Sequence, residues 1–283
     1  MFEPFSAPAP AKVNLALHVL GCRLDGYHEL DSIVAFADLG DTLHFSPAAE
    51  FVLSADGPYA GSLPPPPDNI ISKAHDLAAA IAARRGLRLP GVAIRLSKNL
   101  PIASGIGGGS ANAAAALRGF LKIAGIDHLD SDIMAAVLTL GADVPVCLVG
   151  GTCRMQGIGE RITPLTNFAP RRAVLVNPNV AVATAEVFRK LGLAPGQSHA
   201  AAIKNVNDPA GWRNDLTESA IAVAPVIAEV LAVLRNIPGV SLARMSGSGA
   251  TCFAVVSPQA ENAISGAADL RGWWASPPTV LGA

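Results

Sequence analysis

The chain has 283 residues, of which 51% are hydrophobic and 15% charged, and its formal net charge is −1. This length is enough for two domains with hydrophobic cores. The near-neutral charge argues against a protein that binds nucleic acid through a broad basic face. The longest apolar windows, 133–149 and 220–234, are interrupted by glycine, proline or acidic residues, so neither predicts a membrane-spanning helix.

The cysteine pattern indicates the expected compartment. The sequence has no CxxC pair and no metal-ligand spacing among its four cysteines, which are Cys22, Cys147, Cys153 and Cys252. We therefore expect reduced thiols and a cytoplasmic location. The N-terminal residues show no basic segment leading into an apolar core, and no signal peptide is expected.

In the first half of the chain, apolar and β-branched runs predict strands at 11–20, 33–37, 42–45 and 92–96. Gly40-Asp41 is expected to separate the second strand from the third. Asp68 is expected to cap a helix, which has apolar residues at helical spacing and ends at Gly86. A second helix is expected to follow a glycine loop and to stop at Gly125, and a third is expected between Asp130 or Ser131 and Gly141.

In the second half, strands are predicted at 173–176, 240–245 and 251–256, and helices at 184–191, 217–236 and 259–270. The stretch 199–213 is polar and is expected to be irregular. Because helices and strands are mixed and hairpins look antiparallel, the predicted fold class is α+β rather than a doubly wound parallel sheet. We place the domain boundary near Gly157-Ile-Gly159, which gives domains 1–158 and 159–283.

The segment 101–111, sequence PIASGIGGGSA, predicts a phosphate-binding loop. Glycines let the backbone approach a ligand closely, and the alanine-rich run that follows favours a helix. The N-terminus of such a helix attracts phosphate. Two common phosphate motifs fail, because no lysine follows Gly109 as Walker A needs, and Ser110 stands where the dinucleotide fingerprint needs glycine. The alternative for this segment is a flexible surface loop.

Three further features carry polar chemistry. Lys12 and Asn14 alternate with apolar residues, so they share one face of a predicted strand; the alternative is a strand with a polar outer face. Asp143 lies in an apolar stretch, where a buried carboxylate needs a partner or a function, and Lys12 is the candidate partner. The alternative is that Asp143 is a helix N-cap. Tyr27 and His28 follow a tight turn and could bind a flat ring, or form a turn with a partly buried tyrosine.

Together these segments resemble the GHMP kinase superfamily over nearly the whole chain. The loop at 101–111 is similar to its phosphate motif, and the RMSGSGAT segment at 244–251 is similar to its C-terminal glycine motif. Within the superfamily, one branch phosphorylates a cytidine-diphosphate-linked methylerythritol in non-mevalonate isoprenoid synthesis. This chain is similar to that branch in three segments, at 11–15, 21–30 and 140–145. Ser104 stands where glycine or alanine is common, and Ala111 where serine is common, which could change hydroxyl contacts to phosphate.

The resemblance implies a fold and a set of site residues. The expected fold has an N-terminal domain like domain 2 of ribosomal protein S5 and a ferredoxin-like C-terminal domain, with the site in the cleft between them. Lys12 and Asp143 are the expected catalytic pair, with Asp143 as general base. Asn69 and Lys98 are expected near the adenosine, and ATP phosphates are expected on Pro101, Ile102, Ala103, Ser104, Gly105, Ile106, Gly107, Gly108, Gly109, Ser110 and Ala111.

On the acceptor side, the resemblance implies substrate contacts from Asn14, Tyr27, His28, Thr184, Phe188, Gly247, Ser248 and Gly249. ATP is the expected phosphoryl donor, bound with Mg²⁺, for which the sequence offers no protein ligand set. We expect no nucleic-acid or membrane partner, and a monomer or weak homodimer. Two alternatives remain open: a kinase of the same superfamily for mevalonate, homoserine or a sugar, and a nonenzymatic nucleotide-binding protein. Tyr27-His28 argues against the first, and Lys12 with Asp143 against the second.

Overall fold

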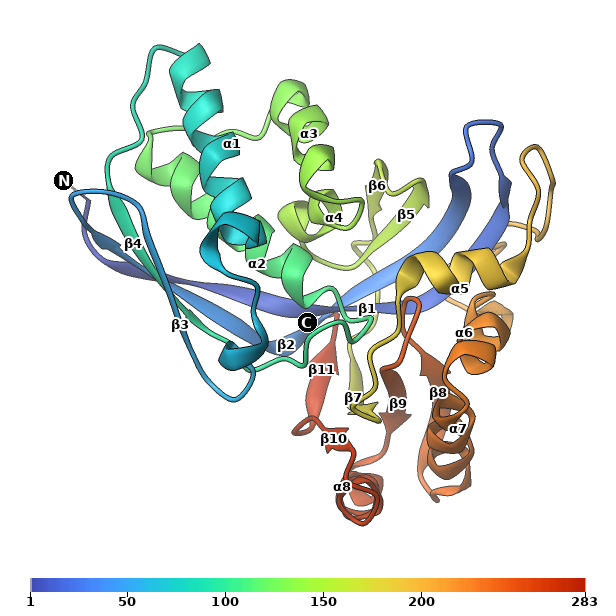
Figure 1. Cartoon of the computed structure of the whole chain (residues 1–283). Helices are drawn as coiled ribbons and strands as arrows, with labels where there is room; N and C mark the ends of the chain where they lie inside the picture. Colours follow the sequence, from blue (N-terminus) through green and yellow to red (C-terminus); the bar gives the residue numbers. More distant parts are fainter. Residues whose placement is uncertain (1, 283) are drawn as a thin grey trace. The chain divides into compact units, whose positions relative to one another are not determined.

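The computed structural model describes residues 2–282, which divide into two compact units (Figure 1). Among these residues, unit 1 comprises 2–11, 39–102 and 107–149, and unit 2 comprises 12–38, 103–106 and 150–282. Both units are discontinuous because two long paired strands, β1 (Phe5–Cys22) and β2 (His28–Pro47), each contribute residues to both. The division of the sequence into domains 1–158 and 159–283 stays a prediction.

Unit 1 combines a small sheet with helices that lie together on one side of its strands (Figure 1). Strand β4 (Val92–Ser97) runs antiparallel to the C-terminal part of β2 and parallel to β3 (Val52–Asp56). The helices are α1 (Ile70–Arg84), α2 (Gly108–Ile123), α3 (Ser131–Val137) and α4 (Val144–Val149). Short 3-10 turns are η1 (Ala60–Ser62), η2 (Pro66–Asp68) and η3 (Leu138–Leu140).

Helix α2 is held against the sheet of unit 1 by close aromatic packing. The rings of Phe45 on β2 and Phe120 on α2 meet edge to face, with centroids 5.8 Å apart. A Cβ on Gly119 would lie 2.3 Å from the Phe45 ring, so only glycine lets the helix approach this closely. This packing fixes the axis of the helix whose N-terminus ends the glycine loop.

Unit 2 contains antiparallel strands from both halves of the sequence. Strand β5 (Cys153–Gly157) pairs with the N-terminal part of β2 and with β6 (Arg161–Pro164). Strand β7 (Arg171–Asn177) lies between β9 (Cys252–Val256) and β11 (Thr279–Leu281), and β9 also pairs with β8 (Val240–Met245). Strand β10 (Trp274–Ala275) pairs with β7. The helical segments are α5 (Thr184–Leu191), η4 (Pro209–Gly211), α6 (Thr217–Val223), α7 (Val226–Asn236), η5 (Pro258–Ala260) and α8 (Glu261–Asp269).

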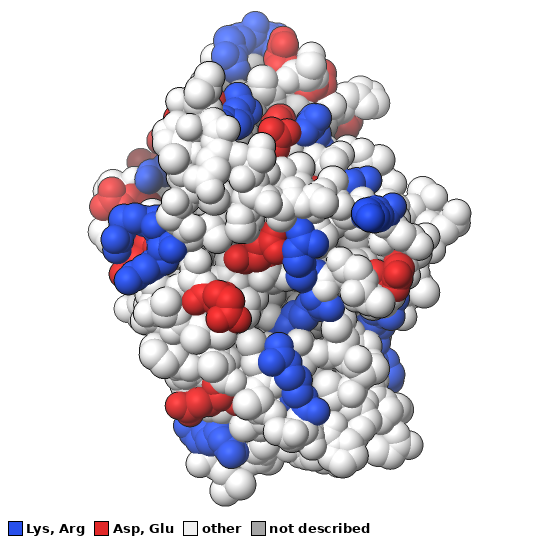
Figure 2. All heavy atoms as spheres, turned by 90° about the vertical axis from the view of Figure 1, so that its right-hand side faces the viewer, with Lys and Arg blue, Asp and Glu red and all other residues white. Residues whose placement is uncertain are grey.

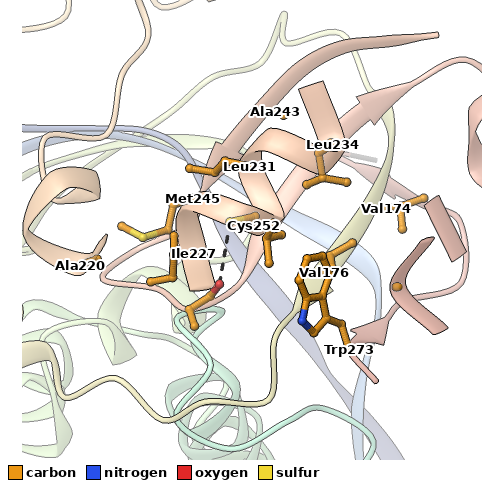
Figure 3. Packing of buried hydrophobic residues seen from close by; sticks show 14 of the residues in the cluster. Val174, Val176, Ala220, Ile227, Leu231, Leu234, Ala243, Met245, Cys252 and Trp273 are labelled. Carbon is orange, nitrogen blue, oxygen red and sulfur yellow. Dashed lines mark hydrogen bonds between the residues drawn. The ribbon is translucent and has the colours of Figure 1, made fainter. Parts of the chain in front are cut away.

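The core of unit 2 lies between these strands and the apolar face of α7. Ile227, Leu231 and Leu234 of α7 are buried against residues of β7, β8 and β9, and Trp273 joins the same cluster (Figure 3). Their spacing of three and four residues puts all three side chains on one side of the helix. The Trp273-Trp274 segment is therefore part of the folded core and sheet of unit 2.

Replacing Leu231 with alanine is expected to destabilise the protein by about 2–5 kcal/mol, because a side chain only 2% exposed leaves a cavity. Chemical denaturation of the purified variant measures this change. Leu270→Ala is the matched control, since Leu270 is 86% exposed, and its unfolding midpoint should stay close to wild type. Equal losses in the two variants would contradict the placement of α7 in the core.

The structure confirms the predicted α+β class and most predicted elements, with three corrections. The strands predicted at 33–37 and 42–45 are one strand, β2, which passes through Gly40-Asp41. The helix predicted at 217–236 is divided into α6 and α7 by Pro225. Asn69, and not Asp68, caps α1, because its side chain accepts a hydrogen bond from the backbone N of Ile71.

Charged side chains of both signs are interspersed among wider uncharged areas on the face shown in Figure 2, as expected for a chain with 15% charged residues. Across residues 2–282, none of the helices has the length and apolar character needed to cross a membrane.

The buried thiols include free cysteines at Cys22, Cys153 and Cys252. Burial raises the pKa of Cys153 to about 11 and that of Cys252 to about 12, so both stay protonated at neutral pH.

Candidate active site

The glycine loop ends at the N-terminus of α2, as predicted. Gly107 precedes the helix in the left-handed conformation, with φ of 65°, and no side chain caps the helix there. The first N–H groups of an α-helix have no partner within the helix, and the helix dipole makes this end positive. A Cβ on Gly109 would meet no atom within 4 Å, so the space beside this turn is open. The arrangement suits a phosphate group bound by backbone N–H groups.

Two predicted nucleotide contacts of unit 1 have defined structural partners. The Asn69 side-chain oxygen caps α1, 3.0 Å from the backbone N of Ile71. The buried Lys98 ammonium forms an ion pair with Asp41, with 2.6 Å between Nζ and Oδ2. A Cβ on Gly108 would lie 3.3 Å from this Nζ, so the ammonium lies beside the first residue of α2.

Residues 103–106 of the glycine loop are bonded, within unit 2, to the C-terminal glycine motif. The Ser104 carbonyl accepts from the backbone N of Thr251 at 3.1 Å, and the Gly105 carbonyl accepts from Ser246 Oγ at 3.0 Å. A Cβ on Gly105 would lie 2.4 Å from the Gly249 carbonyl oxygen. The two glycine segments, which are far apart in the sequence, therefore form one structure in this unit.

Lys12 and Asn14 lie on β1 in unit 2 and are 3% and 1% exposed. The backbone N of Lys12 donates to the Ile106 carbonyl at 2.8 Å, which ties β1 to the glycine loop. The backbone N of Asn14 donates to Ser246 Oγ at 3.1 Å, and its Nδ2 donates to Ser32 Oγ at 2.8 Å. Both residues are therefore buried, and neither side chain lies on a polar outer face of the strand.

The Asn14 side chain has one unused acceptor. Its Oδ1 is buried and has no hydrogen-bond partner among the described residues. A Cβ on Gly247 would lie 3.6 Å from this oxygen, so Oδ1 faces the glycine turn. Because a buried acceptor without a partner is costly, Oδ1 is suited to accept from a ligand hydroxyl.

The predicted base-recognition residues form an aromatic pair in unit 2. The rings of His28 and Phe188 have centroids 4.6 Å apart and are tilted by 36°. His28 Nε2 is buried and has no partner within residues 2–282. Burial lowers the pKa of His28, which favours the neutral ring. Tyr27 is 61% exposed, and its backbone N donates to Asp25 Oδ1. The histidine therefore has a free ring nitrogen to recognise a ligand edge.

Thr184 and Ser248 are also brought together. Their hydroxyl oxygens lie 2.8 Å apart, which joins the start of α5 to the glycine turn at 247–249. Asn214, which the sequence did not indicate, holds this turn from the other side, because its Nδ2 donates to the carbonyls of Met245 and Gly247 at 2.8 Å each. Asn214 lies between the polar stretch 199–213 and the helix predicted from 217, where no periodic signal points to it.

Asp143 lies in unit 1, directly before α4, and is half-buried. Its backbone carbonyl accepts from the N of Cys147 at 3.3 Å, so the residue belongs to the first turn of α4. Arg118 of α2 donates to the Leu148 carbonyl at the other end of α4. Helix α2, which begins at the glycine loop, therefore also contacts the helix that begins after Asp143.

Comparison with known proteins identifies the family. Residues 69–151 match a model described as the GHMP kinases N terminal domain, and residues 198–270 match one described as GHMP kinases C terminal. A Methylorubrum extorquens protein named 4-diphosphocytidyl-2-C-methyl-D-erythritol kinase is 48% identical, covering 95% of this chain and 96% of that protein. The chain belongs to the GHMP kinase family. A protein of the same name from Paramagnetospirillum magneticum is 44% identical, covering 98% of this chain and 99% of its own length.

Solved structures agree with this assignment. A crystal structure titled 4-(cytidine 5'-diphospho)-2C-methyl-D-erythritol kinase is similar with a TM-score of 0.79 and 32% identity, covering 99% of this chain and 100% of that one. A homoserine kinase from Cytophaga hutchinsonii has a TM-score of 0.69 at 18% identity, covering 100% of this chain and 95% of its own. The second likeness shows a shared fold alone.

Proposed function

We propose that this chain transfers the γ-phosphoryl group of ATP to the 2-hydroxyl of 4-diphosphocytidyl-2-C-methyl-D-erythritol, a step of non-mevalonate isoprenoid synthesis. The observation that carries the acceptor's identity is the similarity, at 44–48% identity over nearly the full length of both chains, to relatives named for this reaction. The orphan His28 ring nitrogen beside Phe188 supports it, because a flat base can stack there and bond through its edge.

On the donor side, we propose that ATP phosphates bind the backbone of 101–111 and the N-terminus of α2. The uncapped helix start and the open space at Gly109 support this role. Asn69 and Lys98 are proposed to lie near the adenosine, as the family resemblance implies. The Lys98 side chain also lies beside Gly108, so its ammonium is close to the N-terminus of α2, where the phosphates are proposed to bind.

In the reaction, the acceptor's 2-hydroxyl oxygen bonds to the γ-phosphorus, the bond to the β,γ-bridging oxygen breaks, and ADP leaves. Asp143 is proposed to accept the hydroxyl proton as general base. Lys12 is proposed to pair with this carboxylate and to offset charge on the phosphoryl group. The bond between the Lys12 backbone and Ile106 supports a place for this ammonium beside the phosphate loop.

The acceptor would be held by residues of unit 2. Asn14 Oδ1 is proposed to accept from a substrate hydroxyl, and the Thr184–Ser248 pair to bond the erythritol or its phosphates. Gly247 and Gly249 are proposed to approach the diphosphate with their backbone. Tyr27, which is exposed, is proposed to close over the cytosine from the solvent side.

We propose that Mg²⁺ is bound as the ATP complex and neutralises phosphate charge when bound. Within residues 2–282 there is no group of three His, Cys, Asp or Glu side chains that could hold a metal ion. Mg²⁺ on nucleotides commonly keeps phosphates and water as most of its ligands, so a cage made only of protein ligands is not required. A cytoplasmic location and a monomer or weak homodimer stay predictions.

A coupled ADP-release assay tests the proposed function by comparing three acceptors: the CDP-alcohol, mevalonate and homoserine. Turnover is expected with the CDP-alcohol only. Turnover with mevalonate or homoserine and none with the CDP-alcohol would show that the chain is a different kinase of the family. ATP turnover that is independent of any acceptor would also contradict the proposal.

Phe188→Ala is expected to raise KM for the CDP-alcohol about tenfold, because one face of the base-binding pair with His28 is lost. The KM for ATP should stay at the wild-type value, since Phe188 belongs to the acceptor side. Steady-state kinetics with each substrate varied in turn measures both constants. An unchanged KM for the CDP-alcohol would remove Phe188 from base recognition.

A further inference from the structure

Asp41 has a buried carboxylate that accepts hydrogen bonds from each of the three residues that precede the glycine loop. It is 1% exposed. Its Oδ1 accepts from the backbone N of Asn99 at 2.7 Å and of Leu100 at 2.9 Å. Its Oδ2 accepts from Lys98 Nζ at 2.6 Å. One side chain thus fixes residues 98, 99 and 100, directly before the loop begins at Pro101.

The partner ammonium is buried just as deeply and lies at the phosphate end of the loop. The side chain of Lys98 is 3% exposed. Burial lowers the pKa of Lys98, and the Asp41 charge and hydrogen bond oppose this shift. Nζ would be 3.3 Å from a Cβ on Gly108, the first residue of α2. The Asp41 carboxylate therefore determines where a positive charge stands beside the helix N-terminus.

We propose that Asp41 is a positioning residue of the nucleotide site: it holds the Lys98 ammonium beside Gly108 and sets the course of the backbone into the phosphate loop. The inference rests on the proposed function only in taking ATP as the nucleotide. Its carboxylate does not contact the ligand, and it acts through Lys98 and through the backbone of Asn99 and Leu100.

If Asp41 acted only through its charge, its removal would change ATP affinity in the opposite direction from loss of a positioning role. Removing a negative group near a site for a polyanion lowers repulsion and leaves the lysine charge unopposed, which should tighten ATP binding. A positioning role predicts weaker binding, because the ammonium loses the acceptor that fixes it. The sign of the change in ATP affinity therefore separates the two roles.

Asp41→Asn is the test, because the amide oxygen can still accept from Asn99 and Leu100 while its NH₂ group cannot accept from Lys98. ATP binding to the full chain is measured by calorimetry without acceptor. The Kd is expected to rise on the order of tenfold, as for loss of a hydrogen bond to a charged group. An unchanged or lower Kd would overturn the proposal. Because no acceptor is present, this result is independent of which alcohol the chain phosphorylates.

Asp31→Asn is the matched control for a purely structural effect. Asp31 is also fully buried and bonds Arg154 through both oxygens at 2.7 Å, within unit 2. Both variants are expected to lower the melting temperature, but only Asp41→Asn should weaken ATP binding. If Asp31→Asn weakened ATP binding equally, the effect would be general destabilisation, and the positioning role would be refuted.

A double variant covers the case in which Asp41→Asn leaves a buried lysine that prevents folding. Asp41→Asn with Lys98→Met removes both charges, and replacing both members of a buried pair is tolerated better than breaking it. This variant should bind ATP as weakly as Lys98→Met alone, because Asp41 acts through Lys98. Wild-type ATP affinity in the double variant, or an ATP affinity lower than that of Lys98→Met alone, would contradict the proposal that Asp41 acts through Lys98.

Discussion

Asp143→Asn is expected to lower kcat by about 10²–10⁴-fold, because an amide cannot accept the proton of the attacking hydroxyl. ATP and acceptor affinities should stay near wild type, since the substitution keeps the shape of the residue at the start of α4. Single-turnover kinetics separates the chemical step from binding.

Asp132→Asn provides the control for removing a negative charge from unit 1. Asp132 is exposed in the first turn of α3, so its substitution should leave kcat unchanged. Turnover by Asp143→Asn close to that of Asp132→Asn would refute the general-base assignment.

Gly105→Ala is expected to lower kcat/KM on the order of a hundredfold and to destabilise the protein by about 3 kcal/mol. Gly105 has φ of 76°, and its added Cβ would lie 2.4 Å from the Gly249 carbonyl oxygen. Backbone on both sides has to move, which separates the two glycine segments. Kinetics and chemical denaturation of the same preparation measure both effects.

Gly266→Ala is the matched control, since Gly266 lies in α8 and an added Cβ there meets no atom within 4 Å. It should raise stability by about 0.5–1 kcal/mol through helix propensity and leave kinetics unchanged. If Gly105→Ala matched this control, the close approach of the two glycine segments would not be needed for activity.

The sequence predicted the site segments better than the course of the chain between them. The glycine loop and α2 were predictable because glycines followed by alanines have a strong local preference. Gly40-Asp41 has the local signature of a turn, yet β2 continues through it. The structure explains why glycine is needed there: a Cβ on Gly40 would lie 2.3 Å from the Ala9 carbonyl oxygen. Close packing, and not turning, requires the glycine.

The division between α6 and α7 was available in the sequence, since Pro225 disfavours helix in the residue before it. The apolar periodicity on both sides concealed the break. The contacts of Asn214 and Asp41 could not be predicted, because they are hydrogen bonds to backbone far away in the sequence. Such contacts leave no periodic or motif signal, and they are found only when the fold brings the segments together.

Phosphate transfer followed with ATP labelled at the γ-phosphate is the most direct test of the account. With 4-diphosphocytidyl-2-C-methyl-D-erythritol present, the label should appear in the acceptor, and phosphorus NMR of the product should show a phosphomonoester on the 2-position. Release of the label as inorganic phosphate, or its transfer to a different hydroxyl, would contradict the proposed reaction.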